Sequence, residues 1–179
     1  MTWQPPIRVV GCGSPQGDDA VGWRAIERLR SQMRPNVETH TVSTGWELLD
    51  ILDGRGTLLL IDAVQSGQPP GTIHELRWPD PRLEQAHRGS THGVSPAEAL
   101  RLADACGLLP ARVFIFAIEV GALAPLARLS SPAAASVAEL TRRLENWLEH
   151  DALGLSANPV SLGTANTPLP KHSMSGGRG

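Results

Sequence analysis

The chain has 179 residues, of which 41% are hydrophobic and 19% are charged, and this suits one globular domain with its own core. A net charge of −2 without a basic cluster argues against nucleic acid as a partner. No apolar run has the length of about 18 residues that is needed to span a bilayer. The N-terminus lacks the layout of a signal peptide, and two cysteines make no disulfide framework. We therefore expect a monomeric cytoplasmic protein with no membrane or nucleic-acid partner.

The first half of the chain predicts strands that alternate with helices. A buried strand over Ile7–Gly11 leads into a glycine-rich turn, and an amphipathic helix follows from about Val21 to Met33. Residues 79–92 are polar and are expected to be mostly irregular. The other elements expected in this half are strands over Val37–Val42, Thr57–Ala63 and Thr72–Trp78 and a short helix over Trp46–Leu52.

The second half contains two sequences that are typical of helix starts. Ser95-Pro96-Ala97-Glu98 combines an N-cap serine, a proline at the first helical position and a glutamate three residues after the cap. This helix is expected to end near Cys106, and a strand over Val113–Ile118 follows. Ser131-Pro132 repeats the start signal before a last amphipathic helix.

This alternation predicts a three-layer α/β/α sandwich around a mostly parallel, twisted sheet of roughly five strands. Residues 1–150 are expected to form the single domain. From residue 151 onward Gly, Ser, Pro and Asn dominate without periodicity, so residues 151–179 are predicted to be a flexible tail. In such sheets, function gathers at the carboxyl ends of the strands.

Two carboxylates and one imidazole lie at loops that can converge on one edge of the sheet. Asp19 lies in the turn after the first strand, Asp62 ends the most apolar strand, and His92 precedes the helix opened by Ser95. Oxygen and nitrogen ligands of this kind suit a divalent transition metal such as nickel or zinc. Taken singly, each residue has a structural interpretation as a turn, cap or loop residue; together they form a candidate metal site.

The glycine cluster also allows a nucleotide-binding interpretation. Gly11, Gly13 and Gly17 form Gly-x-Gly-x-x-x-Gly, one residue longer than the dinucleotide-binding spacing. Asp18 and Asp19 stand where a pyrophosphate would meet the helix N-terminus, and their charges would repel it. A Rossmann-like nucleotide-binding module is therefore the less favoured alternative.

The ordered set of motifs resembles the NiFe-hydrogenase maturation endopeptidases. The resemblance runs from about residue 7 to residue 150 and rests on short segments in the family's order. These are Gly11-x-Gly13 with Asp18-Asp19-x-x-Gly22, Ser43-Thr44-Gly45 with Leu48-Leu49, Leu60-Ile61-Asp62-Ala63, Pro70-Gly71-Thr72, Ser90-Thr91-His92 and Ala117-Ile118-Glu119.

The resemblance implies a protease that removes the C-terminal extension of a NiFe-hydrogenase large-subunit precursor after nickel insertion. By motif position, Asp19, Asp62 and His92 would be both the nickel-contacting and the catalytic residues, the nickel being supplied by the precursor. Asp18 would then have a capping role. The chain departs from the family at Ser14, where asparagine is usual, and at Ala20 and Ala117, where glycine is common.

Other interpretations remain open at this point. The same fold could carry a non-catalytic nickel checkpoint or assembly protein, which would bind the precursor without shortening it. His87 lies close enough to His92 in the sequence to be a substitute ligand, and Glu119 could line the cleft. Cys12, between two glycines, is interpreted as a packed residue rather than a nucleophile.

Overall fold

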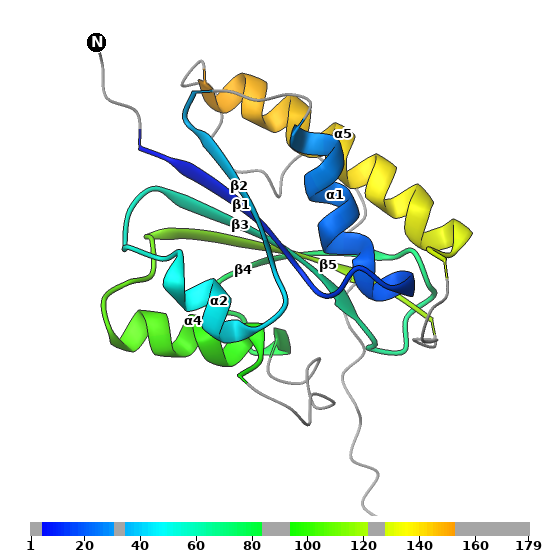
Figure 1. Cartoon of the computed structure of the whole chain (residues 1–179), viewed down its shortest axis with the longest axis horizontal. Coiled ribbons are helices and arrows are strands. Elements are labelled where there is room, and N and C mark those ends of the chain that lie inside the picture. Colours follow the sequence, from blue (N-terminus) through cyan, green and yellow to red (C-terminus); the bar gives the residue numbers. More distant parts are fainter. Residues whose placement is uncertain (1–4, 31–34, 84–93, 122–127, 153–179) are drawn as a thin grey trace, which may run out of the picture.

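The computed structural model describes residues 5–30, 35–83, 94–121 and 128–152 and shows a three-layer α/β/α sandwich (Figure 1). Helices α1 and α5 cover one face of a five-stranded sheet, and α2 and α4 cover the other. The predicted fold class is therefore confirmed. In chain order the elements are β1 (Ile7–Cys12), the 3-10 turn η1 (Gly17–Ala20), α1 (Val21–Leu29), β2 (Val37–Val42), α2 (Gly45–Asp50), β3 (Thr57–Val64), β4 (Ile73–Arg77), α4 (Pro96–Ala105), β5 (Arg112–Glu119) and α5 (Ser131–Ala152).

The strand order β2-β1-β3-β5-β4 brings four carboxyl ends to one edge of the sheet. β1 pairs in parallel with both β2 and β3, and β3 pairs in parallel with β5. Only β4, at an edge of this sheet, runs antiparallel to its neighbour β5. The loops that follow β1, β2 and β3 therefore meet at a common edge, where ligands bind in open α/β sheets.

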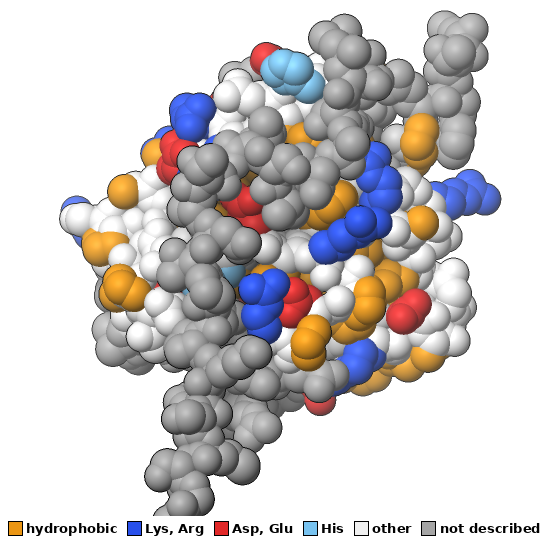
Figure 2. Space-filling model, turned by 180° about the vertical axis from the view of Figure 1, so that it is seen from behind, with side chains coloured by type: hydrophobic (Ala, Val, Ile, Leu, Met, Phe, Trp, Pro, Cys, Tyr) orange, Lys and Arg blue, Asp and Glu red, His pale blue; other side chains and the backbone are white. Residues whose placement is uncertain are grey.

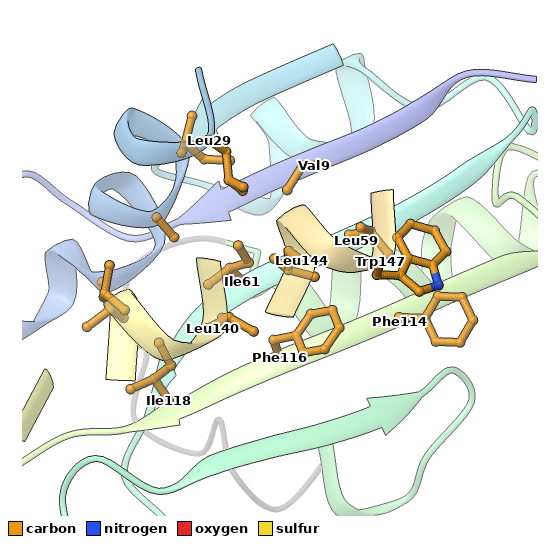
Figure 3. Close-up of a cluster of buried hydrophobic side chains, with 14 of the residues drawn as sticks. Val9, Leu29, Leu59, Ile61, Phe114, Phe116, Ile118, Leu140, Leu144 and Trp147 are labelled. Carbon is orange, nitrogen blue, oxygen red and sulfur yellow. The ribbon is translucent and has the colours of Figure 1, made fainter. Parts of the chain in front are cut away.

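Two hydrophobic clusters hold the layers together. β3 is buried on both faces: alternate residues such as Leu59 and Ile61 pack toward α1 and α5, whereas Leu58 and Leu60 pack toward α2 and α4. On the α5 side, Trp147 lies over Phe114 of β5 (Figure 3). Helices cover the sheet on both faces, and this explains why the sequence of β3 is continuously apolar.

Most expected boundaries agree with the structure to within one or two residues. The helix expected over 21–33 is described as far as Leu29, and residues 31–34 lie outside the described residues. Helix α5 continues to Ala152, two residues into the segment expected as a tail. Residues 153–179 lie outside the described part, so the flexible tail and the domain boundary stay predictions.

The surface charge and the helices can be compared with the expectation of no nucleic-acid and no membrane partner. On the face opposite the view of Figure 1, positive, negative and hydrophobic side chains are interspersed among the residues that are not grey (Figure 2). The described part of this face therefore presents no continuous basic surface. None of the helices in the described ranges combines the length and the apolar character that crossing a membrane requires.

Candidate active site

A pocket of about 300 Å³ lies at the carboxyl edge of the sheet. It is lined by the ends of β1 and β3, by the loop between β2 and α2 and by the start of α4. Both predicted carboxylates, Asp19 and Asp62, contribute to its wall. The other lining residues are Cys12, Gly13, Ser14, Ser43, Thr44, Gly45, Ala63, Val94, Ser95 and Pro96.

Asp62 reaches the pocket because of the alternation along β3. It lies on the same face of the strand as Leu58 and Leu60, which pack toward α2 and α4. The residue is 8% exposed, and its Oδ1 accepts a hydrogen bond of 2.9 Å from the backbone N–H of Ala63. Burial and this bond therefore restrict the orientation of the carboxylate at the strand end.

Asp19 reaches the pocket from η1, which joins the β1 turn to α1. It is partly exposed, and its carbonyl oxygen accepts a bond of 3.4 Å from the N–H of Ser14. Gly13 has a φ of 126°, and a Cβ there would lie 2.1 Å from the Asp19 carbonyl oxygen. A side chain at position 13 would push Asp19 out of place, so this glycine has a structural requirement.

Cys12 is among the residues that line the pocket and is 2% exposed. Burial raises the pKa of its thiol well above the ordinary value, and the charges of Asp62 and Asp19 raise this pKa further. The thiol therefore stays protonated at neutral pH. Because the thiolate is the nucleophilic form, this placement agrees with the interpretation of Cys12 as a packed residue.

Val94, two residues after His92 in the sequence, is the first of three consecutive lining residues that lead into α4. The N–H of Gly45 donates a bond of 2.9 Å to the Val94 carbonyl, which joins the β2–α2 loop to the start of α4. Ser95 and Glu98 form the predicted capping box, with the Ser95 N–H 2.8 Å from the Glu98 carboxylate. His92 and its substitute His87 lie outside the described residues.

Asp18 has a different role from the one expected. It makes no capping bond to η1 or α1, and it points away from the pocket to the start of α5. Its two carboxylate oxygens accept bonds from Ser130, at 2.6 Å from the backbone N–H and 2.7 Å from the hydroxyl. The partners are 112 residues apart, so local sequence could not indicate this contact.

Glu119 does not line the described pocket, although it ends β5 near the same edge. It is 1% exposed and accepts hydrogen bonds from the N–H and hydroxyl of Ser66 and the N–H of Gly67. The Nε2 atom of His74 lies 3.1 Å from its Oε2. Sequence reasoning missed this buried pair, because an acid and a histidine 45 residues apart carry no pairing signal.

Trp46 and Trp78 differ in their surroundings. Trp46 on α2 is 56% exposed next to the pocket-lining residue Gly45, whereas Trp78 is partly buried against a hydrophobic cluster. Within the described ranges, no three His, Cys, Asp or Glu side chains come together as a metal site. The described part of the pocket thus supplies two carboxylates, Asp19 and Asp62.

A family model described as hydrogenase maturation protease matches residues 24–147, more than half of the chain. The chain belongs to the hydrogenase maturation protease family. Among curated proteins, the hydrogenase expression/formation protein HupD of Thiocapsa roseopersicina is 32% identical over 124 residues, which are 66% of this chain. The match spans only 56% of the length of that relative. HupD of Rhodobacter capsulatus is 27% identical and is covered over 72% of its length.

Solved structures of an endopeptidase and of a hydrogenase maturation protease share this architecture. An endopeptidase from Escherichia coli superposes with a TM-score of 0.71 at 26% identity, over 87% of this chain and 98% of that chain. The maturation protease HycI of Thermococcus kodakarensis superposes with a TM-score of 0.64 at 18% identity, over 80% of this chain and 92% of that chain. The second likeness supports the fold alone, and the family assignment rests on the sequence match.

Proposed function

We propose that this protein is an endopeptidase that removes the C-terminal extension of a NiFe-hydrogenase large-subunit precursor after nickel insertion. The observation that carries the proposal is the pocket at the carboxyl edge of the sheet, which brings together Asp19 and Asp62 from segments 43 residues apart. Membership of the maturation protease family supplies the reaction class.

The proposed ligand set is Asp19, Asp62 and His92, and the nickel belongs to the precursor. Carboxylate oxygens and an imidazole nitrogen are ligands that nickel accepts. Val94 lines the pocket, and two residues of chain span at most about 7 Å, so covalent geometry allows His92 to reach the same edge. A protein site with three ligands leaves positions for the precursor's own ligands.

The three residues would act chiefly by recognition and placement. Asp62, which is buried, would contact the metal from the end of β3, and the more exposed Asp19 would contact it from η1. Contact with the metal would hold the precursor's scissile peptide beside the pocket. A bound metal can polarise a carbonyl or activate water, which is the chemistry that peptide hydrolysis needs.

Replacement of the proposed ligands tests this site. Asp19→Ala, Asp62→Ala and His92→Ala should each leave a folded protein and reduce processing of nickel-loaded precursor by at least about a hundredfold, as loss of a metal contact would. Asp104→Ala, at an exposed acid of α4, is the matched control and should process normally. Circular dichroism checks folding, and mass spectrometry of the precursor measures cleavage. Normal processing by all three variants would refute the site.

A further inference from the structure

We propose that Asp18 and Ser130 form a tether that positions Asp19 in the pocket. This inference rests on the proposed function, because it assigns a positioning role toward the proposed nickel-contacting carboxylate. The two adjacent acids point in opposite directions: Asp19 lines the pocket between the sheet and α2 and α4, whereas Asp18 bonds to the start of α5 on the other side.

The tether is a strong local constraint. Asp18 is 8% exposed, and each of its carboxylate oxygens accepts one bond from the same residue. Such two-point contacts fix orientation as well as distance, and hydrogen bonds to a charged group are about twice as strong as neutral ones. The N-terminus of α5, which favours negative charge, faces Asp18.

The position of Ser130 makes it a rigid anchor. Its carbonyl accepts from the Ala134 N–H at 2.9 Å, and its hydroxyl lies 3.4 Å from the Ala133 N–H, so Ser130 occupies the cap of α5. Helix α5 has 22 residues and shares the hydrophobic cluster with α1, which directly follows η1. The anchor therefore lies at the cap of a helix that is itself packed into the hydrophobic core.

The geometry of η1 transmits this constraint to Asp19. A 3-10 turn has three residues per turn, so successive side chains project about 120° apart. Fixing the Asp18 side chain on the α5 side consequently fixes the direction in which Asp19 projects. On the other flank, the Asp19 carbonyl is bonded to Ser14 and confined by Gly13. Asp18 is thus a positioning residue, and the adjacent acids have separate tasks.

The test compares Ser130 variants in processing of nickel-loaded precursor. Ser130→Ala removes one bond of the tether and should lower kcat/KM by about tenfold or more, the usual effect of losing an outer-shell partner of a metal ligand. Ser130→Thr keeps the hydroxyl and should restore most of the rate. Ser136→Ala is the matched control: it removes a hydroxyl of the same helix that donates to the Gly71 carbonyl at 2.6 Å, and it should leave kcat/KM unchanged.

A double-mutant cycle separates positioning from general destabilisation. In an Asp19→Asn background, Ser130→Ala should cause little further loss, because a tether that acts through Asp19 has nothing left to position. An equal loss in both backgrounds, or a wild-type rate in Ser130→Ala, would overturn the tether. A wild-type rate in Asp19→Asn would instead overturn the site of the proposed function, together with any role that works through Asp19.

Discussion

The acidic side chains of this protein differ in their hydrogen-bond partners and in their burial. Asp18 and Glu119 are buried, and each uses both oxygens to hold a distant segment of the chain. Asp53 instead pairs with Arg8 near the amino ends of the parallel strands, opposite the pocket. Asp19 is the carboxylate of this group that lines the pocket and is partly open to solvent. Its accessibility is what makes it suited to contact an incoming substrate.

The ion pair between Arg8 and Asp53 predicts a defined pH dependence of stability. Arg8 Nη2 lies 2.9 Å from Asp53 Oδ2, and this contact lowers the pKa of Asp53 from 3.8 to about 2. Because the pKa is lowered in the folded state, the stabilisation is complete above about pH 4 and is lost as the pH falls toward 2. The Asp53 side chain is 45% exposed, so solvent screening limits the effect to about 1 kcal/mol.

Asp53→Asn should therefore lower the free energy of unfolding at pH 7 by about 1 kcal/mol and have little effect near pH 2. Urea denaturation at both pH values measures the difference. Asp104→Asn, at an exposed acid of α4, is the control. A difference between Asp53→Asn and the wild type that stays the same at pH 7 and at pH 2 would contradict this assignment.

At the scale of elements, the contact of β1 with α1 sets the place of the first loop. A Cβ at Gly22 would lie 2.4 Å from the Cys12 carbonyl oxygen and 2.7 Å from that of Ile61. A Cβ at Gly11 would lie 2.3 Å from the Gly22 carbonyl oxygen. The helix therefore packs directly on the backbones of β1 and β3, and η1 is held against the sheet edge.

Gly22→Ala should force α1 away from the sheet. The neighbouring atoms are backbone and cannot rotate aside, so we expect a loss of about 1–3 kcal/mol in the free energy of unfolding, the usual cost of overpacking. Chemical denaturation measures it. Glu27→Ala, on the exposed side of the same helix, should change stability by less than about 0.5 kcal/mol. A Gly22→Ala protein as stable as this control would show that the contact is not tight.

The elements themselves were readable from the sequence because their signals are local. Apolar strands covered on both faces, such as β3, and the Ser95–Glu98 capping box depend on neighbouring residues, and both are confirmed. The helix start at Ser131 was predicted one residue late as a cap, because Ser130 supplies the capping hydroxyl. Side-chain partners across the fold, such as Ser130 for Asp18, have no local signal.

The candidate site was predictable to the extent that it depends on topology. Parallel strands bring their carboxyl ends together, so Asp19 and Asp62 were expected at one edge, and both line the pocket. The assignment of His92 depends on a loop outside the described residues and stays a prediction. The direction of the Asp18 side chain could not be foreseen, because it depends on Ser130 at the start of α5, which is far away in the sequence.

At the scale of the whole molecule, the two helical layers have different tasks. α1 and α5 bury the larger cluster, including Trp147, and Ser130 at the cap of α5 bonds to Asp18. The starts of α2 and α4, joined by the bond from Gly45 to Val94, form the wall of the pocket that faces Asp62. The layer of α1 and α5 thus holds the segment after β1 in place. The layer of α2 and α4 shapes the pocket that Asp19 of this segment lines.

The most direct test of the central claim is a mass measurement on the precursor. The purified protein is incubated with nickel-loaded and with nickel-free large-subunit precursor, and the C-terminus of each is read by mass spectrometry. We predict loss of a C-terminal peptide from the nickel-loaded form alone. Binding without any change in precursor mass would contradict the proposed protease activity and favour a non-catalytic checkpoint, and equal cleavage of both forms would contradict recognition of nickel.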